Sequence, residues 1–134
     1  IRLKNMQKKL LILGAVLGLL GVILGAFASH GLEKLLTNEQ LETFQVGVRY
    51  QFYHAFLALI LGSTTFIPNK AKNILFVLLL SGVTLFSGSI YGLATNSLTG
   101  FDFTKIALLT PTGGLLLISA WVLILFQVLK MKTK

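Results

Sequence analysis

Hydrophobic residues fill four long stretches of this chain, and polar residues gather between them. Three of the stretches carry no charged side chain: residues 10–28, 73–94 and 106–129. The fourth, residues 44–67, contains only Arg49 and His54 as ionisable residues besides tyrosines. A helix rises about 1.5 Å per residue and needs about 20 residues to cross about 30 Å of hydrocarbon, which is close to the length of each stretch. The pattern therefore predicts four membrane-spanning helices.

This pattern predicts an all-α membrane protein, with one domain over residues 1–134 and four transmembrane helices in an antiparallel bundle. The expected spans are approximately residues 8–29, 44–67, 72–95 and 106–130. Residues 32–43 are expected to form an interfacial segment at the outer surface. Only 12% of the residues are charged, against roughly 25% in an average soluble protein. Almost nothing remains for a soluble domain.

Basic and acidic residues lie at opposite ends of the expected spans. Nine of the 12 basic residues flank alternate ends of the spans: Arg2, Lys4, Lys8, Lys9, Lys70, Lys72, Lys130, Lys132 and Lys134. The 4 acidic residues fall at the other ends: Glu33, Glu39, Glu42 and Asp102. Because cytoplasmic loops are enriched in Lys and Arg, the sequence predicts a multi-pass protein of the cell membrane with both termini in the cytoplasm. The net charge of +8 then indicates contact with anionic lipid and no nucleic-acid partner.

The N-terminal region has a second interpretation. A basic start, an apolar run and "AFAS" at 26–29 also resemble a signal peptide with an A-x-A cleavage site. The run exceeds the usual length of about 7 to 15 residues, which favours a retained helix. Met6 is an alternative start, with residues 1–5 as an extension. The chain has 0 cysteines, which excludes disulfides and thiolate metal sites.

Local signals predict where the helices begin and end. Thr37, followed three residues later by Gln40, forms a capping-box pattern that starts the second helix near Asn38. Asn69 is the expected N-cap of the third helix. Gly31 is expected to end the first helix in the left-handed conformation.

The start of the last helix has two alternatives. Thr110 is an N-cap with Pro111 at the first helical position, or the helix begins near Asp102 and kinks at Pro111. Residues 103–109 are correspondingly an interfacial turn or a first half-helix. The string "TPTGG" at 110–114 could direct backbone N–H groups at an anion. A simple helix start that allows close packing is the favoured interpretation.

Glycines recur on one face of the first helix at intervals of 4, 3 and 4 residues: Gly14, Gly18, Gly21 and Gly25. Small residues let membrane helices approach closely, where dispersion contacts stabilise them. We therefore expect this face to pack against protein and the first helix to be a buried packing partner.

Polar residues of the second and third spans are expected to meet in the outer half of the bundle. Gln51 and His54 share one helical face with small residues, and such a face normally contacts protein rather than lipid. The short turn "PNKAK" makes the two helices antiparallel neighbours, so residues equally far from it lie at equal depth. The candidate site is the resulting polar cluster: Arg49, Gln51, His54, Ser87, Ser89 and Tyr91.

This cluster has several functional interpretations. The favoured one is a hydrogen-bond network that fixes helix register. A second is a binding site for a lipid headgroup, quinone or similar amphiphile, with Arg49 as anion partner and His54 or Tyr91 as donor. A proton pathway is disfavoured because one histidine without a membrane carboxylate makes a poor relay. No catalytic residues are assigned, since every acid lies outside the spans. His30 and His54 lack a ligand set for a metal.

Four strings, in order, resemble a known family: "GAFASHGL" (25–32), "YQFYHA" (50–55), "FSGSIYGL" (86–93) and "TPTGG" (110–114). They are similar to the YgdD/YwdK family of small four-span bacterial inner-membrane proteins, whose vertebrate relatives are called transmembrane protein 256. The resemblance covers nearly the whole chain from Met6. It implies the four-span fold and supplies no reaction, because the family's function is unknown.

We therefore expect a non-enzymatic accessory or scaffold protein of the membrane that needs no cofactor. Its expected partners are membrane lipids and either further copies of itself or a larger membrane-protein complex. The alternative function is a small carrier or channel subunit that acts as an oligomer.

Overall fold

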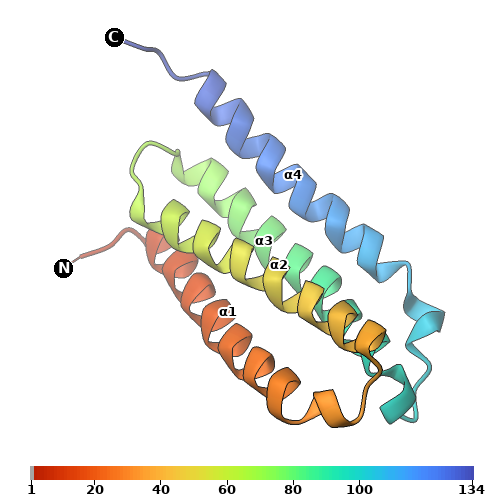
Figure 1. Cartoon of the computed structure of the whole chain (residues 1–134). Coiled ribbons are helices and arrows are strands. Elements are labelled where there is room, and N and C mark those ends of the chain that lie inside the picture. Colours follow the sequence, from red (N-terminus) through yellow and green to blue (C-terminus); the bar gives the residue numbers. More distant parts are fainter. Residues whose placement is uncertain (1) are drawn as a thin grey trace.

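A computed structural model describes residues 2–134, and their regular structure is entirely helical. Figure 1 shows four long helices: α1 (Asn5–His30), α2 (Asn38–Ser63), α3 (Asn69–Ala94) and α4 (Leu109–Leu129). Short 3₁₀ turns lie in the connections at one end of the molecule: η1 (Leu32–Lys34), η2 (Asn96–Leu98) and η3 (Phe103–Ile106). Both termini and the α2–α3 turn lie at the opposite end. The all-α class is confirmed.

Three helical segments of the described chain are long and apolar enough to cross a membrane: Asn5–Lys34, Asn69–Ala94 and Phe103–Leu129. Helix α2 is not one of them, although it is as long as α1 and α3, with 26 residues in each helix. The reason is compositional, since α2 carries Arg49, Gln51 and His54 in its middle.

The helices pack mainly in chain order, α1 on α2, α2 on α3 and α3 on α4, with a smaller contact between α1 and α3. One apolar core runs through all four helices: Leu10, Leu13, Ala55, Ala58, Leu75, Leu79, Leu117 and Ala120. A second, smaller core lies towards the 3₁₀ turns: Ala28, Leu32, Leu36, Phe44, Val48 and Ala94. Small residues in both cores bring the helix backbones close enough for dispersion contacts to accumulate.

The predicted capping box at the start of α2 is confirmed. The Gln40 backbone N–H donates to Thr37 Oγ1 over 3.1 Å, and the Thr37 N–H donates to Gln40 Oε1 over 2.9 Å. Two donors that have no partner within the helix are satisfied in this way. The helix consequently begins at Asn38, as predicted.

Gly31 caps the end of α1, as predicted, but its predicted left-handed conformation and the predicted N-cap of α3 are wrong. Gly31 has φ −110° and ψ −57°, in the right-handed region. A side chain at this position would meet Phe27, whose Cε2 lies 3.0 Å from an added Cβ. Asn69 is the first residue of α3, and Pro68 is the N-cap with φ −61° and ψ 149°.

The start of α4 also differs from the prediction. The helix begins at Leu109, so Thr110 is not its N-cap, and Pro111 is its third residue. Proline is tolerated there because the first four N–H groups of a helix have no partner within it. Residues 103–106 form the separate turn η3, capped by Asp102, whose carboxylate accepts from the Thr104 backbone N–H over 3.1 Å. The structure thus shows a separate 3₁₀ turn and not a kinked half-helix.

The "TPTGG" string brings α4 close to α3. A Cβ added at Gly113 would lie 2.8 Å from Phe86 Cα and 2.9 Å from the Gly82 carbonyl oxygen, both backbone atoms of α3. These backbone atoms cannot yield as a flexible side chain can. The favoured interpretation of the string, close helix packing, is confirmed.

Candidate functional site

The polar side chains in the middle of α2 are buried. Gln51 is 4% exposed and His54 is 3% exposed. Both side chains bond to neighbouring helices and are not on the outer surface of the bundle. Each can therefore be assigned its hydrogen-bond partners.

Gln51 connects three helices. Its Nε2 donates to the Leu17 carbonyl of α1 over 2.8 Å, and its Oε1 accepts from the Tyr91 hydroxyl of α3 over 2.6 Å. A side-chain amide has both a donor and an acceptor end, and here each end is used in a different direction. Gln51 thus fixes the register of α1 and α3 relative to α2.

His54 is held by partners at both ring nitrogens. Its Nδ1 lies 2.7 Å from the Tyr50 carbonyl, and its Nε2 lies 3.2 Å from the indole Nε1 of Trp121 on α4. A carbonyl can only accept, so Nδ1 carries the proton, and an indole N–H can only donate, so Nε2 accepts. The two partners together select the neutral imidazole. A neutral ring is the form that an apolar environment tolerates at least cost.

The serines of α3 bond separately from these two residues. Ser87 Oγ donates to the Gly47 carbonyl of α2 over 2.8 Å. Ser89 Oγ lies 2.5 Å from Thr110 Oγ1 of α4. The expected single cluster is therefore a set of separate bonds, distributed over the α1–α2–α3, α2–α4 and α3–α4 interfaces. Within residues 2–134, no buried side-chain nitrogen or oxygen lacks a hydrogen-bond partner.

Arg49, placed in the cluster by the sequence, lies outside it. Its guanidinium donates to Glu42 Oε1 over 2.8 Å, and the two side chains are 46% and 67% exposed. The residues are seven apart, which is about two helical turns and places them on one face of α2. This spacing could have revealed the pair from the sequence. Arg49 and His54 do not share a partner.

A groove lies between α2 and α4 beside His54. Its volume is about 290 Å³, and we call it the α2–α4 groove; its lining residues are Tyr50, His54, Phe86, Gly114, Leu117, Ile118 and Trp121. The rings of Tyr50 and Phe86 meet with centroids 5.0 Å apart. Trp121 is 49% exposed and forms part of the opposite wall. Trp121 was not assigned to the site from the sequence, since no spacing rule relates residues 67 apart on different helices.

The glycines of α1 differ in what they face. Cβ atoms added at Gly14 and Gly21 would lie 2.8 Å from the Ala55 carbonyl oxygen and 2.9 Å from the Phe52 ring. One added at Gly25 would make an ordinary contact of 3.6 Å with Val48. Gly18 has nothing within 4 Å of such an atom. Most of α1 faces outwards, so the expectation of a buried first helix is wrong. The buried residues of α1 are Leu10, Leu13, Gly14, Leu17, Gly21 and Ala28.

A metal site is not indicated by the geometry. In the part of the chain that the structure describes, no three His, Asp or Glu side chains lie together closely enough to hold an ion. The carboxylates lie at the end of the molecule that carries the 3₁₀ turns. The helices around α2 supply hydrogen-bond partners to Gln51 and His54, and an apolar groove lies beside His54.

Comparison with known proteins identifies the family. Residues 24–114 match a family described as "Protein of unknown function (DUF423)". The chain belongs to this family. The matched segment includes His54, Gln51 and its α3 partner Tyr91, and it ends before Trp121. No solved structure was found to match the chain significantly.

Three relatives in this family are similar over almost their whole length. The UPF0382 membrane protein YwdK of Bacillus subtilis is 36% identical over 92% of this chain and 98% of its own. A UPF0382 membrane protein of Haemophilus influenzae is 33% identical over 96% and 99%. The UPF0382 inner membrane protein YgdD of Escherichia coli is 33% identical over 93% and 92%. This confirms the predicted resemblance, and the chain is a membrane protein of a family of unknown function.

Proposed function

We propose that all four helices cross the cell membrane, with both termini on the cytoplasmic side. Helix α2 equals α1 and α3 in length, packs against both, and turns Gln51 and His54 inwards. These two polar side chains would then be hidden from the hydrocarbon, as a membrane requires. Nine basic residues lie at the end that carries the termini and the α2–α3 turn, which the positive-inside rule places in the cytoplasm. The name of the Escherichia coli relative supports the cell membrane.

The 0 cysteines of the chain allow a direct test of this topology. Lys132→Cys and Thr99→Cys place one thiol at each end of the molecule. A membrane-impermeant maleimide is expected to label the Thr99→Cys variant in intact cells. It is expected to label the Lys132→Cys variant only after the cells are opened. Labelling of both variants from one side would contradict four spans.

We further propose that the protein is a non-enzymatic accessory protein of the membrane, which holds a lipid or another amphiphile in the α2–α4 groove. The observation that carries this proposal is the bonding of His54. Both ring nitrogens are engaged, by Tyr50 and Trp121, so the one intramembrane histidine is not poised to move a proton. A general acid or base needs a free nitrogen within reach of its substrate.

The groove fits the apolar part of an amphiphile. Its walls are mostly aliphatic and aromatic, with Leu117 and Ile118 opposite Tyr50 and Phe86. Ligand pockets of this kind are predominantly apolar, with a few polar atoms that fix orientation. Tyr50 is 41% exposed and is one of the polar residues of the lining. Arg49 is not part of this proposal, because Glu42 occupies its guanidinium.

Native mass spectrometry of the protein released from membranes in mild detergent tests the groove. Wild type is expected to retain an amphiphile, and Gly114→Phe, which fills the groove, is expected to lose it. Leu115→Phe is the matched control, because Leu115 is 64% exposed and lies outside the lining. Equal retention by the Gly114→Phe variant, or no retained molecule in wild type, would contradict the proposal.

The same experiment reports the oligomeric state and any associated protein. Large apolar side chains cover the outer face of α4, among them Leu115, Val122 and Leu125. We propose that this face contacts lipid tails, further copies of the chain or a larger membrane complex. A reproducible ion conductance of the purified protein, abolished by Gln51→Leu, would instead support the rival function of an oligomeric channel or carrier subunit.

A further inference from the structure

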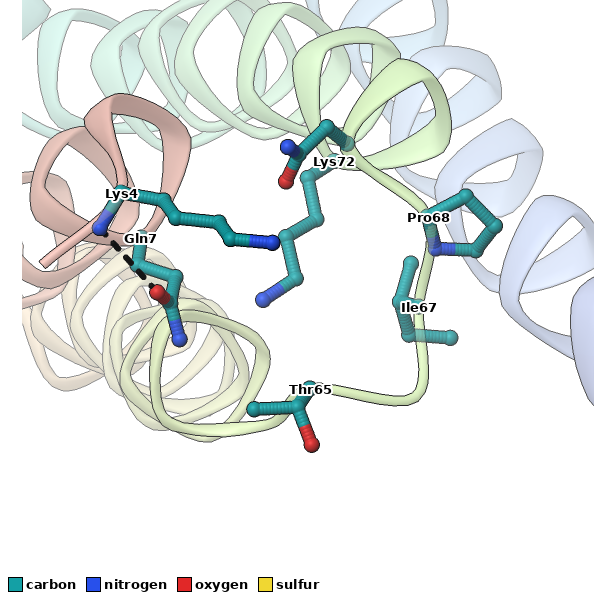
Figure 2. A pocket seen from close by; sticks show the side chains of 7 residues that line it. Lys4, Gln7, Thr65, Ile67, Pro68 and Lys72 are labelled. Atoms are coloured by element: carbon teal, nitrogen blue, oxygen red, sulfur yellow. Dashed lines mark hydrogen bonds between the residues drawn. The ribbon is translucent and has the colours of Figure 1, made fainter.

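A second polar site lies at the other end of the molecule, where α1 begins and α2 turns into α3. Figure 2 shows this pocket, which has a volume of about 140 Å³ and is lined by Lys4, Gln7, Thr65, Asn69 and Lys72, among others. We call it the basic pocket. It shares no lining residue with the α2–α4 groove.

Lys72 is the unusual residue of the basic pocket. It is only 1% exposed, although lysine is almost never fully buried unless it is paired. Its ammonium donates to the Thr64 carbonyl, which uses one of three donors. The described ion pairs do not include Lys72. A buried ammonium without a counter-charge is costly, so this position favours the approach of an anion.

Lys4 adds a second positive charge. In Figure 2 its side chain extends across the pocket towards Lys72, and the two ammonium groups repel each other. The acids cannot relieve this repulsion, because they lie in η1, in the first turns of α2 and beside η3, at the opposite end of the molecule. Two lysines are therefore held together around a space that contains no negative side chain.

The remaining lining supplies neutral donors. Gln7 accepts from the Lys4 backbone N–H through its Oε1, over 3.2 Å, which leaves the amide NH₂ free to donate. Asn69 opens α3, so the positive end of that helix dipole lies at the pocket. The volume is roughly ten times that required for one buried water, enough for a tetrahedral anion with part of its hydration.

We propose that the basic pocket binds a phosphate group, presented by the headgroup of an anionic membrane lipid. Its chemistry is that of a phosphate site, with two ammonium groups, an amide donor and a helix N-terminus converging on one space. The lipid source rests on the proposed topology, which places this end of the helices in the headgroup layer of the cytoplasmic leaflet. The affinity for phosphate itself rests only on the geometry of the pocket.

Binding to the full-length protein in mild detergent tests this proposal. The probes are phosphatidylglycerol, diacylglycerol with the same chains, and inorganic phosphate, with retention read by native mass spectrometry and protection by thermal melting. Wild type is expected to bind phosphatidylglycerol and not diacylglycerol. Lys72→Met and Lys4→Gln are expected to weaken this binding by about tenfold or more, the loss of one charge-assisted hydrogen bond. Protection by inorganic phosphate that depends on the same lysines would support the site and identify a soluble anion as its ligand.

Lys8→Gln is the matched control, since Lys8 is an exposed residue in the first turns of α1, close to Lys4 in the chain, and lies outside the pocket. It removes the same charge and is expected to leave the affinity within about twofold. Equal losses in the Lys8→Gln and Lys4→Gln variants would overturn the proposal in favour of diffuse attraction. Unchanged phosphatidylglycerol binding by the Lys4→Gln variant would also overturn the proposal. If the Lys72→Met variant does not fold, the Lys4→Gln variant alone decides whether the basic pocket binds phosphate. These results do not depend on whether the α2–α4 groove holds an amphiphile.

Discussion

Trp121 on α4 donates its indole N–H to Nε2 of His54 on α2 over 3.2 Å. Helix α4 otherwise packs mainly on α3, so this bond joins two helices that are not neighbours in the chain. The rings meet edge to face, with centroids 6.1 Å apart and an interplanar angle of 72°. One hydrogen bond therefore selects the tautomer of the histidine and also joins two of the residues that line the α2–α4 groove.

Trp121→Phe keeps the aromatic contact and removes the indole N–H that donates to His54 Nε2. A buried acceptor left without a partner costs about 1–3 kcal/mol in proteins generally, whereas interhelical bonds in membranes average about 0.6 kcal/mol. We expect the unfolding free energy in detergent to fall by about 1 kcal/mol. A double-mutant cycle with His54→Leu should give a coupling energy near 0.6 kcal/mol, and a coupling of zero would show that the bond does not form.

Gln51→Leu is expected to destabilise the protein more than Arg49→Gln. The first substitution leaves the Tyr91 hydroxyl without its acceptor and removes a bond to α1, at a cost of about 1–3 kcal/mol. The second removes an exposed ion pair with Glu42, which contributes about 0–1 kcal/mol. Chemical unfolding of both variants in the same detergent measures the difference. The opposite order of stabilities would place the important polar contact at Arg49.

Two glycines one turn apart on α1 provide a matched pair. Gly14→Leu introduces a side chain that would start 2.8 Å from the Ala55 carbonyl oxygen, whereas Gly18→Leu extends into open space. Overpacking of this kind costs about 1–3 kcal/mol or more. Thermal melting in detergent is expected to show a clear loss for the Gly14→Leu variant and little change for the Gly18→Leu variant. Similar losses would mean that α1 packs through a different face.

The connection between α3 and α4 is expected to be sensitive to acid. Hydrogen bonds from the Thr104 hydroxyl and backbone N–H hold the pKa of the Asp102 carboxyl below its ordinary value of 3.8. A lowered folded-state pKa means that the carboxylate adds stability above pH 3.8, and that this stability is lost as the pH falls through the folded-state pKa. Amide hydrogen exchange at residues 102–106 should accelerate below that pH in wild type. Asp102→Ala should show fast exchange already at neutral pH, and a slow, pH-independent rate in both proteins would contradict the cap.

The features that were predictable from the sequence depend on local geometry. The capping box of Thr37 and Gln40 requires only residues three apart. The short turn between α2 and α3 places Gln51 and Tyr91 at similar depths, but it does not specify that these two residues bond to each other. In the capping box the chain itself determines the distance between the partners, whereas the turn determines only the approximate depth. Arg49 and Glu42 belong to this class too, because seven residues along one helix specify a face.

The features that could not be predicted depend on how separate helices are placed. One face of α1 is defined by the spacing of its glycines: Gly14, Gly18, Gly21 and Gly25. The spacing does not tell which of these glycines α2 contacts. In the structure α2 contacts Gly14 and Gly21, and the space beside Gly18 is open. The contact of Trp121 with His54 depends on the rotation of α4, which no periodicity determines. Lys72 is a basic loop residue by pattern, and only the fold shows that it is buried.

The protonation of His54 is the most direct test of the account, which holds that the polar side chains of α2 are satisfied by other helices. The chain has 2 histidines, so a His30→Gln variant labelled with ¹⁵N-histidine reports His54 alone by NMR. At neutral pH we predict a neutral ring with a proton on Nδ1, an unprotonated Nε2 and slow exchange with solvent. A ring that exchanges both tautomers rapidly, or carries its proton on Nε2, would contradict the hydrogen bonds to Tyr50 and Trp121 and the inward orientation of α2.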